Sequence, residues 1–225
     1  MSRIEGVPER RAGLLVRIIY RVARHEIARL TGRRDRLTGD IPIRAHRPRT
    51  LVGYGVLEKA VASRPGVEAR LRALVVLKSA VMQGCEMCQD IGSHEARAAG
   101  VSDEQLLDLY RYRESPHFDD TERLVLDLAV AMTLTPVQVG DELFAALKER
   151  FDDGQLVELV NLIAVENLRS RFNAAFAIRS AGFSEGMACA RMEPGPASNA
   201  DGNDASDQEE PVQPAPHLAG MPGGA

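Results

Sequence analysis

The sequence predicts an all-α fold. Between its Gly and Pro residues, apolar side chains return every three or four positions, the spacing that gives a helix one apolar face. No segment alternates apolar and polar residues with a period of two, and no Asn-Gly or Asp-Gly pair joins two such segments. Aromatic residues make up 4% of the chain and Trp is absent. The core must therefore consist mainly of Leu, Val, Ala and Ile, which suits packed helices.

The first expected helix, residues 8–30, is basic and amphipathic. Pro8 suits a first-turn position, and one approximate apolar stripe contains Leu14, Leu15, Ile18, Ile19, Val22 and Ile27. Residues 1–50 hold 13 Arg and five acidic residues, so this helix could lie on an anionic membrane surface. The simpler interpretation is a peripheral helix that packs on its own domain or on another subunit. Gly and Pro residues in 31–49 then predict a polar linker.

Three consecutive helices are expected in the centre of the chain, separated by Gly or Pro residues. Gly84 is the break that matters most, because a new helix opens directly after it with Cys85. The expected ranges are 50–62, 67–83 and 85–99.

Capping residues and breakers mark four further helices. Ser102 with Gln105 three positions later is typical of a capping box, Pro136 stops the following helix, and Gly182 is expected to end the last one. The expected ranges are 102–112, 119–134, 141–151 and 155–181.

Residues 184–225 have the composition of a disordered tail. They hold one Arg and seven acidic residues, and they are rich in Pro, Gly, Ala, Asp and Asn. Such a segment buries too little apolar surface to offset its ordering entropy. Cys189 lies in it. The predicted organisation is a basic N-terminal helix and linker (1–50), a helical domain (51–183) and an acidic tail (184–225).

Composition argues against several classes of protein. No run reaches the roughly 18 apolar residues that a membrane span needs, and the run 14–20 lacks the cleavage site of a signal peptide. Three Cys residues are too few for a disulfide scaffold, so we expect a cytoplasmic protein without an integral membrane segment. We also expect no nucleic-acid partner, because the body is acidic and no helix-turn-helix signature follows the basic segment.

The motif Gly84-Cys85-Glu86-Met87-Cys88 is the centre of the predicted chemistry. Three residues of a helix rotate by about 300°, so the two sulfur atoms lie about 60° apart on one face and can form a disulfide. The positive end of the helix dipole favours the thiolate of a first-turn cysteine. A thiolate with a resolving cysteine one turn away can attack a peroxide or a disulfide and be released as an intramolecular disulfide.

Three other interpretations of the pair stay open. The cysteines could be buried structural thiols, or an ancestral redox motif that no longer turns over. They could also be half of a zinc site, which needs four ligands, but only His94 is near in sequence and Cys189 is in the tail. We therefore predict no metal and no cofactor.

Six short segments between residues 70 and 183 carry a resemblance to a known family. They are 71–78 (LRALVVLK), 84–88 (GCEMC), 95–102 (EARAAGVS), 141–144 (DELF), 155–159 (QLVEL) and 166–173 (ENLRSRFN). Together they resemble the carboxymuconolactone decarboxylase superfamily, specifically its alkylhydroperoxidase D-like members. The resemblance implies an alkylhydroperoxidase D-like helical bundle that forms a homo-oligomer. It also implies thiol-dependent peroxide reduction, or electron transfer from a dithiol or disulfide reductase to a peroxidase.

The resemblance implies that Cys88 is attacked by peroxide and that Cys85 resolves it. The dipole argument instead makes Cys85 the more acidic thiol, so the order of attack stays open. The family pattern CxxCxxxH also requires a His where Gly92 stands and an upstream Glu where Ala73 stands, and it has a polar residue in place of Met87. Because general acid–base help contributes roughly 10²–10⁴-fold, we predict slow turnover.

Three other residues are candidates for handling the proton. Glu166 lies in an apolar run of the last helix, where a carboxylate is costly to bury without a partner. It could accept a proton, or it could form a structural ion pair with Arg169 or Arg171. His94 is expected to point away from both cysteines, and Lys78 could support a thiolate at the helix start.

The predicted function is therefore peroxiredoxin-type peroxide reduction through a reversible disulfide between Cys85 and Cys88, with Glu166 as a tentative proton acceptor. A non-catalytic thiol sensor or partner-binding scaffold is one alternative. A decarboxylase or lactone-type enzyme of the same superfamily is the other, although that chemistry has no evident need for the cysteine pair.

Overall fold

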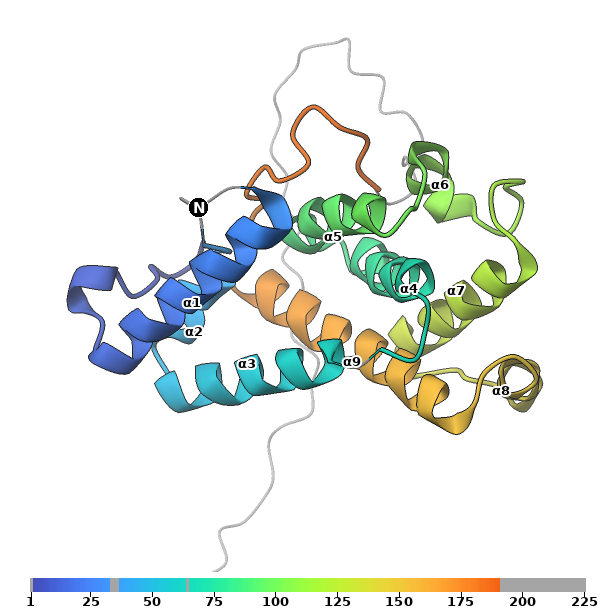
Figure 1. The fold of residues 1–225 in the computed structure, drawn as a ribbon, viewed down its shortest axis with the longest axis horizontal. Coiled ribbons are helices and arrows are strands. Elements are labelled where there is room, and N and C mark those ends of the chain that lie inside the picture. Colours follow the sequence, from blue (N-terminus) through green and yellow to red (C-terminus); the bar gives the residue numbers. More distant parts are fainter. Residues whose placement is uncertain (1, 33–36, 64, 191–225) are drawn as a thin grey trace, which may run out of the picture. The chain divides into compact units, whose positions relative to one another are not determined.

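A computed structural model describes residues 2–32, 37–63 and 65–190, and every regular element in these ranges is a helix. The prediction of an all-α fold is confirmed (Figure 1). The elements are η1 (Glu9–Arg11), α1 (Leu14–Thr31), α2 (Asp40–Arg44), α3 (Pro48–Ala62), α4 (Ala69–Met82), α5 (Glu86–Ala98), α6 (Asp103–Asp108), η2 (Leu109–Arg111), α7 (Asp120–Thr133), α8 (Asp141–Lys148) and α9 (Asp153–Ala175).

Helix α4 is the centre of the fold. It packs against α5, α7 and α9 (Figure 1). Its buried residues lie on all sides of the helix: Leu71, Leu74, Val75, Leu77, Lys78, Ser79, Ala80 and Val81. A helix that buries its whole circumference is a core helix. Val75 belongs to a cluster shared with α7, α8 and α9, whereas Leu74 and Leu77 belong to one shared with α5, α6 and α7.

Capping interactions begin three of the helices within two residues of the expected starts. Ser102 and Gln105 form the expected reciprocal capping box at α6, and equivalent boxes begin α7 and α9. The helix expected over 102–112 is divided, because α6 ends at Asp108 and continues as the tighter turn η2.

The expected linker at 31–49 is partly helical. It contains α2, and α3 already begins at Pro48, which suits the first turn of a helix. Within α2, Asp40 and Arg44 are buried and form an ion pair with an N–O distance of 3.2 Å. Composition alone cannot reveal such a helix, because an Asp and an Arg in a polar stretch do not disclose that they will be buried as a pair.

Helix α1 buries a face that matches the expected stripe only in part. Among the described side chains of α1 the buried ones are Val16, Tyr20 and Ile27, of which Ile27 belongs to the expected stripe, and the Tyr20 hydroxyl donates a hydrogen bond to the carbonyl of Val7 at 2.7 Å. Val16 and Tyr20 pack in a cluster with Ala45 and Leu51 of the same chain. Four residues of the expected stripe are exposed instead: Leu14, Leu15, Ile18 and Val22.

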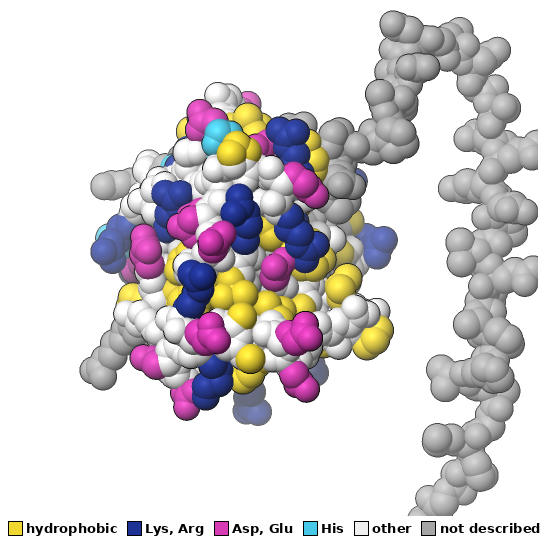
Figure 2. Space-filling model, turned by 90° about the vertical axis from the view of Figure 1, so that its right-hand side faces the viewer, with side chains coloured by type: hydrophobic (Ala, Val, Ile, Leu, Met, Phe, Trp, Pro, Cys, Tyr) yellow, Lys and Arg dark blue, Asp and Glu magenta, His cyan; other side chains and the backbone are white. Residues whose placement is uncertain are grey.

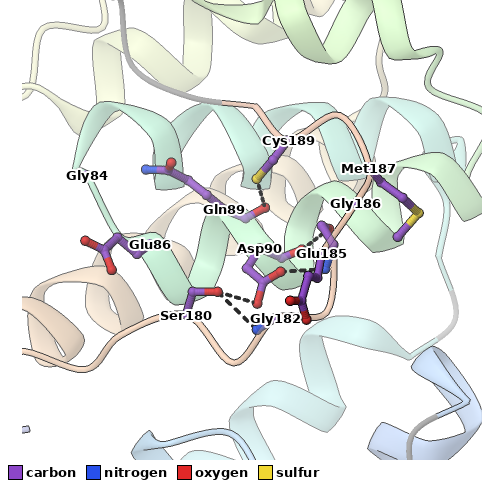
Figure 3. Close-up of a pocket in the computed structure, with 11 residues that line it drawn as sticks. Gly84, Glu86, Gln89, Asp90, Ser180, Gly182, Glu185, Gly186, Met187 and Cys189 are labelled. Carbon is purple, nitrogen blue, oxygen red and sulfur yellow. Dashed lines mark hydrogen bonds between the residues drawn. The ribbon is translucent and has the colours of Figure 1, made fainter. Parts of the chain in front are cut away.

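The last helix is shorter than expected and its continuation folds back. Helix α9 ends at Ala175, and Ala177 takes a left-handed φ of 52°. The chain then returns over α5 (Figure 1). There the carboxylate of Asp90 accepts a hydrogen bond from the Ser180 hydroxyl at 2.8 Å (Figure 3). It also accepts hydrogen bonds from the backbone N–H groups of Phe183 (2.9 Å) and Ser184 (2.6 Å).

The expected boundary of the acidic tail at residue 184 is wrong. Ser184 and Ala190 are buried, and the Ser93 hydroxyl accepts a hydrogen bond from the Ala190 N–H at 3.0 Å. Cys189 is half-buried beside α5. Residues 191–225 lie outside the described residues. The segment 184–190 is ordered by polar contacts with α5, which composition does not disclose.

The side of the domain near α6, α7 and α8 carries acidic and basic side chains interspersed around a strip of hydrophobic ones (Figure 2). The exposed large hydrophobic residues between α6 and α8 are Leu107, Leu134, Val137 and Phe144. Among the residues that the structure describes, no helix combines the length and hydropathy required to cross a bilayer.

We expect Asp90→Ala to loosen the segment that follows α9. Hydrogen bonds to a charged group are worth about 1.5–3 kcal/mol each, so the free energy of unfolding should fall by about 2–4 kcal/mol. Urea denaturation measures this loss, and amide hydrogen exchange should accelerate at Phe183 and Ser184. Asp120→Ala is the control, because its ion pair with Arg123 is exposed and should contribute less than about 1 kcal/mol. Unchanged exchange at Phe183 and Ser184 would mean that apolar contacts hold the segment.

The effect of Asp90→Ala should also depend on pH. Burial raises the pKa of Asp90, but hydrogen bonds from Ser184, Phe183 and Ser180 outweigh it and leave the pKa lowered. A carboxyl whose folded pKa is depressed stabilises the fold above its unfolded pKa of about 3.9. The stabilisation is lost as the pH falls through the folded pKa. The stability difference between native protein and variant should therefore shrink below about pH 4.

Candidate active site

The cysteine motif lies at the junction of α4 and α5. Gly84 adopts a left-handed φ of 63°, which glycine tolerates best, and turns the chain into an extended Cys85. Cys85 is the N-cap of α5, and its sulfur accepts a hydrogen bond from the Cys88 N–H at 3.3 Å. The helix therefore begins one residue later than expected, and Cys85 caps it instead of forming its first turn.

Cys85 and Cys88 are joined by a disulfide, with their Cα atoms 5.2 Å apart. The two residues are only 4% and 2% exposed. They share an apolar cluster with Ile43, Ala80, Met87 and Ile178. One side of the disulfide is therefore hydrophobic, and water has little access to it.

Helix α9 presents polar side chains to the disulfide. The Asn173 amide nitrogen Nδ2 lies 3.4 Å from each sulfur, and the Ser170 hydroxyl lies 3.6 Å from Cys88 Sγ. Both residues are buried. The Asn173 oxygen Oδ1 has no hydrogen-bond donor among the described residues.

Glu166 completes this polar face. Its carboxylate is fully buried, it accepts a hydrogen bond from the Ser170 hydroxyl at 2.7 Å, and one of its oxygens lies within 4.8 Å of both sulfur atoms. Burial raises the pKa of Glu166, and the positive charge of Arg169 opposes this rise. A buried carboxylate of raised pKa beside two sulfur atoms is suited to exchange a proton with a thiol.

Arg169 extends the network to α3, which lies beside α9 (Figure 1). Its Nη1 bonds Glu166 at 2.7 Å, and its Nη2 lies 2.8 Å from both carboxylate oxygens of Glu58. The Tyr54 hydroxyl donates to Glu58 and lies 3.2 Å from Arg169 Nε. The expected ion pair of Glu166 with an arginine is thus present, and it involves Arg169.

The three predicted site residues, Cys85, Cys88 and Glu166, lie together in the structure. Ser170 and Asn173 were not predicted. Both were recognisable in principle, because they follow Glu166 by four and seven residues, the spacing of one helix face. Tyr54 and Glu58 were not predicted either. They lie more than a hundred residues before Arg169, and no local pattern indicates that contact.

The position of the family's relay histidine is tightly packed. Gly92 is buried, and a Cβ atom built on it would lie 3.2 Å from Leu77 Cδ1. Ala73, at the position of the upstream Glu, packs against the cluster around Leu74 and Leu77. Both positions are therefore apolar contacts between helices.

The remaining sequence candidates lie elsewhere. Among the described residues, the ligand atoms within 4.8 Å of one another belong to Cys85, Cys88 and Glu166, and His94 is not one of this group. Lys78 donates to the Leu109 carbonyl at 3.1 Å and its ammonium lies 4.7 Å from the Tyr112 ring centroid. The Lys78 ammonium therefore stabilises the packing of α4 against η2 and the residue that follows it.

Cys85, Cys88 and Glu166 also offer the donor atoms of a metal site. Two thiolates and a carboxylate would suit zinc, but sulfur atoms joined in a disulfide cannot act as thiolate ligands.

A cleft of about 690 Å³ lies on another face of α5. The 180–189 segment forms one wall, and Glu86, Gln89 and Asp90 line the other (Figure 3). Neither Cys85 nor Cys88 lines it. The cleft is therefore separate from the disulfide.

The sequence profile of the carboxymuconolactone decarboxylase family matches residues 53–131. An uncharacterised Bacillus subtilis protein, YdfG, is 31% identical over 111 residues, which cover 49% of this chain and 76% of the relative. The chain belongs to the carboxymuconolactone decarboxylase family. The uncharacterised Escherichia coli protein YnjA is 40% identical over 119 residues, or 53% of this chain, and the match spans just under two thirds (65%) of YnjA.

Solved structures support membership of the alkylhydroperoxidase D-like branch of this family. An Agrobacterium tumefaciens protein described as a putative antioxidant defence protein AhpD is 27% identical, with a TM-score of 0.58 over 61% of this chain and 94% of its own. The apo debrominase Bmp8 shares the fold, with a TM-score of 0.68 over 80% of this chain and 94% of its own, at 20% identity. A peroxidase-related protein from Ralstonia eutropha does so as well, at 18% identity and a TM-score of 0.67 over 81% and 94%.

Substitution of Gly92 tests how tightly α4 and α5 are packed at this position. We expect Gly92→His to lower the free energy of unfolding by about 1–3 kcal/mol, because overpacking a filled core forces neighbours to shift. Gly53→Ala is the control: its Cβ would meet nothing within 4 Å, and in a helix the change should stabilise by up to about 1 kcal/mol. Urea denaturation compares them. A Gly92→His protein as stable as the native one would show that α4 and α5 can separate to admit the ring.

Proposed function

We propose that the protein reduces peroxides through a reversible disulfide between Cys85 and Cys88, with Glu166 as the proton acceptor. The observation that carries the proposal is the fully buried Glu166 carboxylate within 4.8 Å of both sulfur atoms. A structural disulfide has no need for a carboxylate beside it, since burying one is costly. Thiol chemistry does need a group that takes up and returns a proton.

Cys88 is the thiol that we assign to the attack on peroxide. Its sulfur is the one beside the Ser170 hydroxyl, which also bonds Glu166. This contact offers a path along which the Cys88 proton passes to Glu166. Asn173 Nδ2 donates toward both sulfurs and would stabilise negative charge on either.

Peroxide reduction would proceed through a sulfenic acid on Cys88 and then a disulfide. The Cys88 thiolate attacks one oxygen of the peroxide, the O–O bond breaks, and the departing alkoxide takes the proton from Glu166 to become an alcohol. Cys88 is now a sulfenic acid. The Cys85 thiol attacks its sulfur, forms the disulfide, and releases water. A dithiol or a disulfide reductase then returns two electrons and two protons, which regenerates both thiols.

The unpaired oxygen of Asn173 favours a site that alternates between two states. A buried acceptor without a donor is costly, and Oδ1 has none among the described residues in the disulfide form. A thiol group in the reduced form is a donor that could reach it. We also expect the working protein to be a cytoplasmic homo-oligomer.

Cysteine variants test the proposal and the order of attack. We expect native protein to consume peroxide under a dithiol reductant, and Cys85→Ser and Cys88→Ser each to abolish turnover. Cys85→Ser should still form a sulfenic acid on Cys88, detected by dimedone labelling, whereas Cys88→Ser should form none. Labelling of Cys85 in Cys88→Ser would reverse the order. Cys189→Ser is the control and should keep native turnover.

The same experiment separates the alternatives. A disulfide that forms and reverses without sustained peroxide consumption would indicate a thiol sensor. Thiols that never oxidise would leave only a structural pair, and an activity that survives loss of both cysteines would indicate decarboxylase or lactone chemistry.

Glu166→Gln tests the proton acceptor. We expect kcat/KM for peroxide to fall by about 10²–10⁴-fold, the usual contribution of general acid–base catalysis. Glu158→Gln is the matched control, because Glu158 is on the same helix and pairs with Arg72 at 2.7 Å, about 12 Å along the helix from Glu166 by its rise per residue. Native kcat/KM in Glu166→Gln would assign Glu166 a structural role only.

A further inference from the structure

One guanidinium group connects Glu166 to Glu58. Arg169 divides its donors between the two carboxylates: Nη1 bonds Glu166 at 2.7 Å, Nη2 bonds both oxygens of Glu58 at 2.8 Å, and Nε lies 3.2 Å from Glu58 Oε1. Glu58 therefore receives three of the four contacts. Glu166, which is fully buried, receives one.

We propose that Glu58 is a positioning residue: by sharing Arg169 with Glu166 it allows Glu166 to take up a proton from Cys88 and to return it. The role assigned to Glu58 rests on the proposed function of Glu166. If Arg169 were bound to Glu166 alone, the carboxylate would be fully neutralised by a fixed cation and would be a poor proton acceptor.

The charges around Glu166 support this role. Burial is the main cause that raises the pKa of Glu166. The charge of Arg169 opposes the rise, and the negative charges of Glu58 and of Glu95 on α5 add to it. Two carboxylates, those of Glu58 and Glu166, thus share one arginine.

Tyr54 and Arg44, which lie beside the Glu58–Arg169–Glu166 network, contribute hydrogen bonds and stacking and add little net charge. Burial raises the pKa of the Tyr54 phenol, so the hydroxyl stays neutral and donates to Glu58. Arg44 on α2 stacks between the rings of Tyr54 and Phe172, with its Cζ 3.8 and 3.7 Å from their centroids. Its charge is paired with Asp40. On α5, Glu95 is exposed and His94 is its neighbour in the chain.

An infrared titration of the oxidised protein tests the role of Glu58 directly. The carbonyl band of protonated Glu166 is identified by its loss in Glu166→Gln. In native protein we expect this band to appear with a midpoint above the ordinary Glu pKa of about 4.3. In Glu58→Gln, Arg169 pairs with Glu166 alone and one negative charge is gone, so the midpoint should fall by on the order of one pH unit. Glu58→Asp keeps the charge and should restore the native midpoint.

Two outcomes would overturn the role of Glu58. One is the same midpoint in native protein and in Glu58→Gln. The other is a native midpoint at or below the ordinary Glu pKa, which decides the matter even where Glu58→Gln does not fold. Glu158→Gln, which removes a carboxylate paired elsewhere on α9, should leave the midpoint unchanged.

Alkylation of the reduced protein by iodoacetamide extends the test to the thiols. The rate should follow thiolate formation, and its dependence on pH should shift to lower pH in Glu58→Gln, because less negative charge surrounds Cys88. An unshifted profile would contradict the role of Glu58. Neither readout uses peroxide, so failure of the protein to consume peroxide would refute the proposed function while the midpoint of Glu166 still decides the role of Glu58.

Discussion

The burial of the Glu166 carboxylate is the constraint on which the arrangement around the disulfide depends. An ionisable group removed from water needs a partner or must lose its charge. Arg169, three residues further along α9, supplies the partner. Arg169 in turn bonds Glu58, so the need to satisfy one buried group draws α3 against α9 and joins the N-terminal part of the chain to the core. Arg44 adds to this junction by stacking on Tyr54 of α3 and Phe172 of α9.

Helix α5 is held on two faces by different physical means. One face carries the disulfide and meets the polar side of α9 through Ser170 and Asn173. On another face Asp90 gathers the backbone of the segment that follows α9. Because α9 and its continuation hold both faces, the position of α5 is determined by groups that are distant in sequence. These contacts hold the two sulfur atoms beside Glu166.

The chain departs from the family's pattern of proton-handling residues, and the structure gives the reason. Gly92 is in tight contact with Leu77, which the family's histidine would have to displace, and Ala73 is partly buried against an apolar cluster. The carboxylate beside the sulfur atoms comes from α9 instead. The polar group is thus supplied by the opposite wall of the same site, which keeps α4 packed closely on α5.

Local signals in the sequence determined the helical class, most helix starts and the cysteine pair. Capping boxes and breakers act between residues three or four positions apart, and they can be read without knowing the fold. The same is true of Gly84 before Cys85. The sequence also marked Glu166 as unusual, because a carboxylate in an apolar run needs an explanation. Only the tertiary structure decided what surrounds it. The contacts of Arg169 with Glu58, of Asp90 with 180–184, and of Tyr20 on α1 with Ala45 and Leu51 join residues far apart in the chain. Their energies depend on geometry and on exclusion of water, which no local pattern specifies.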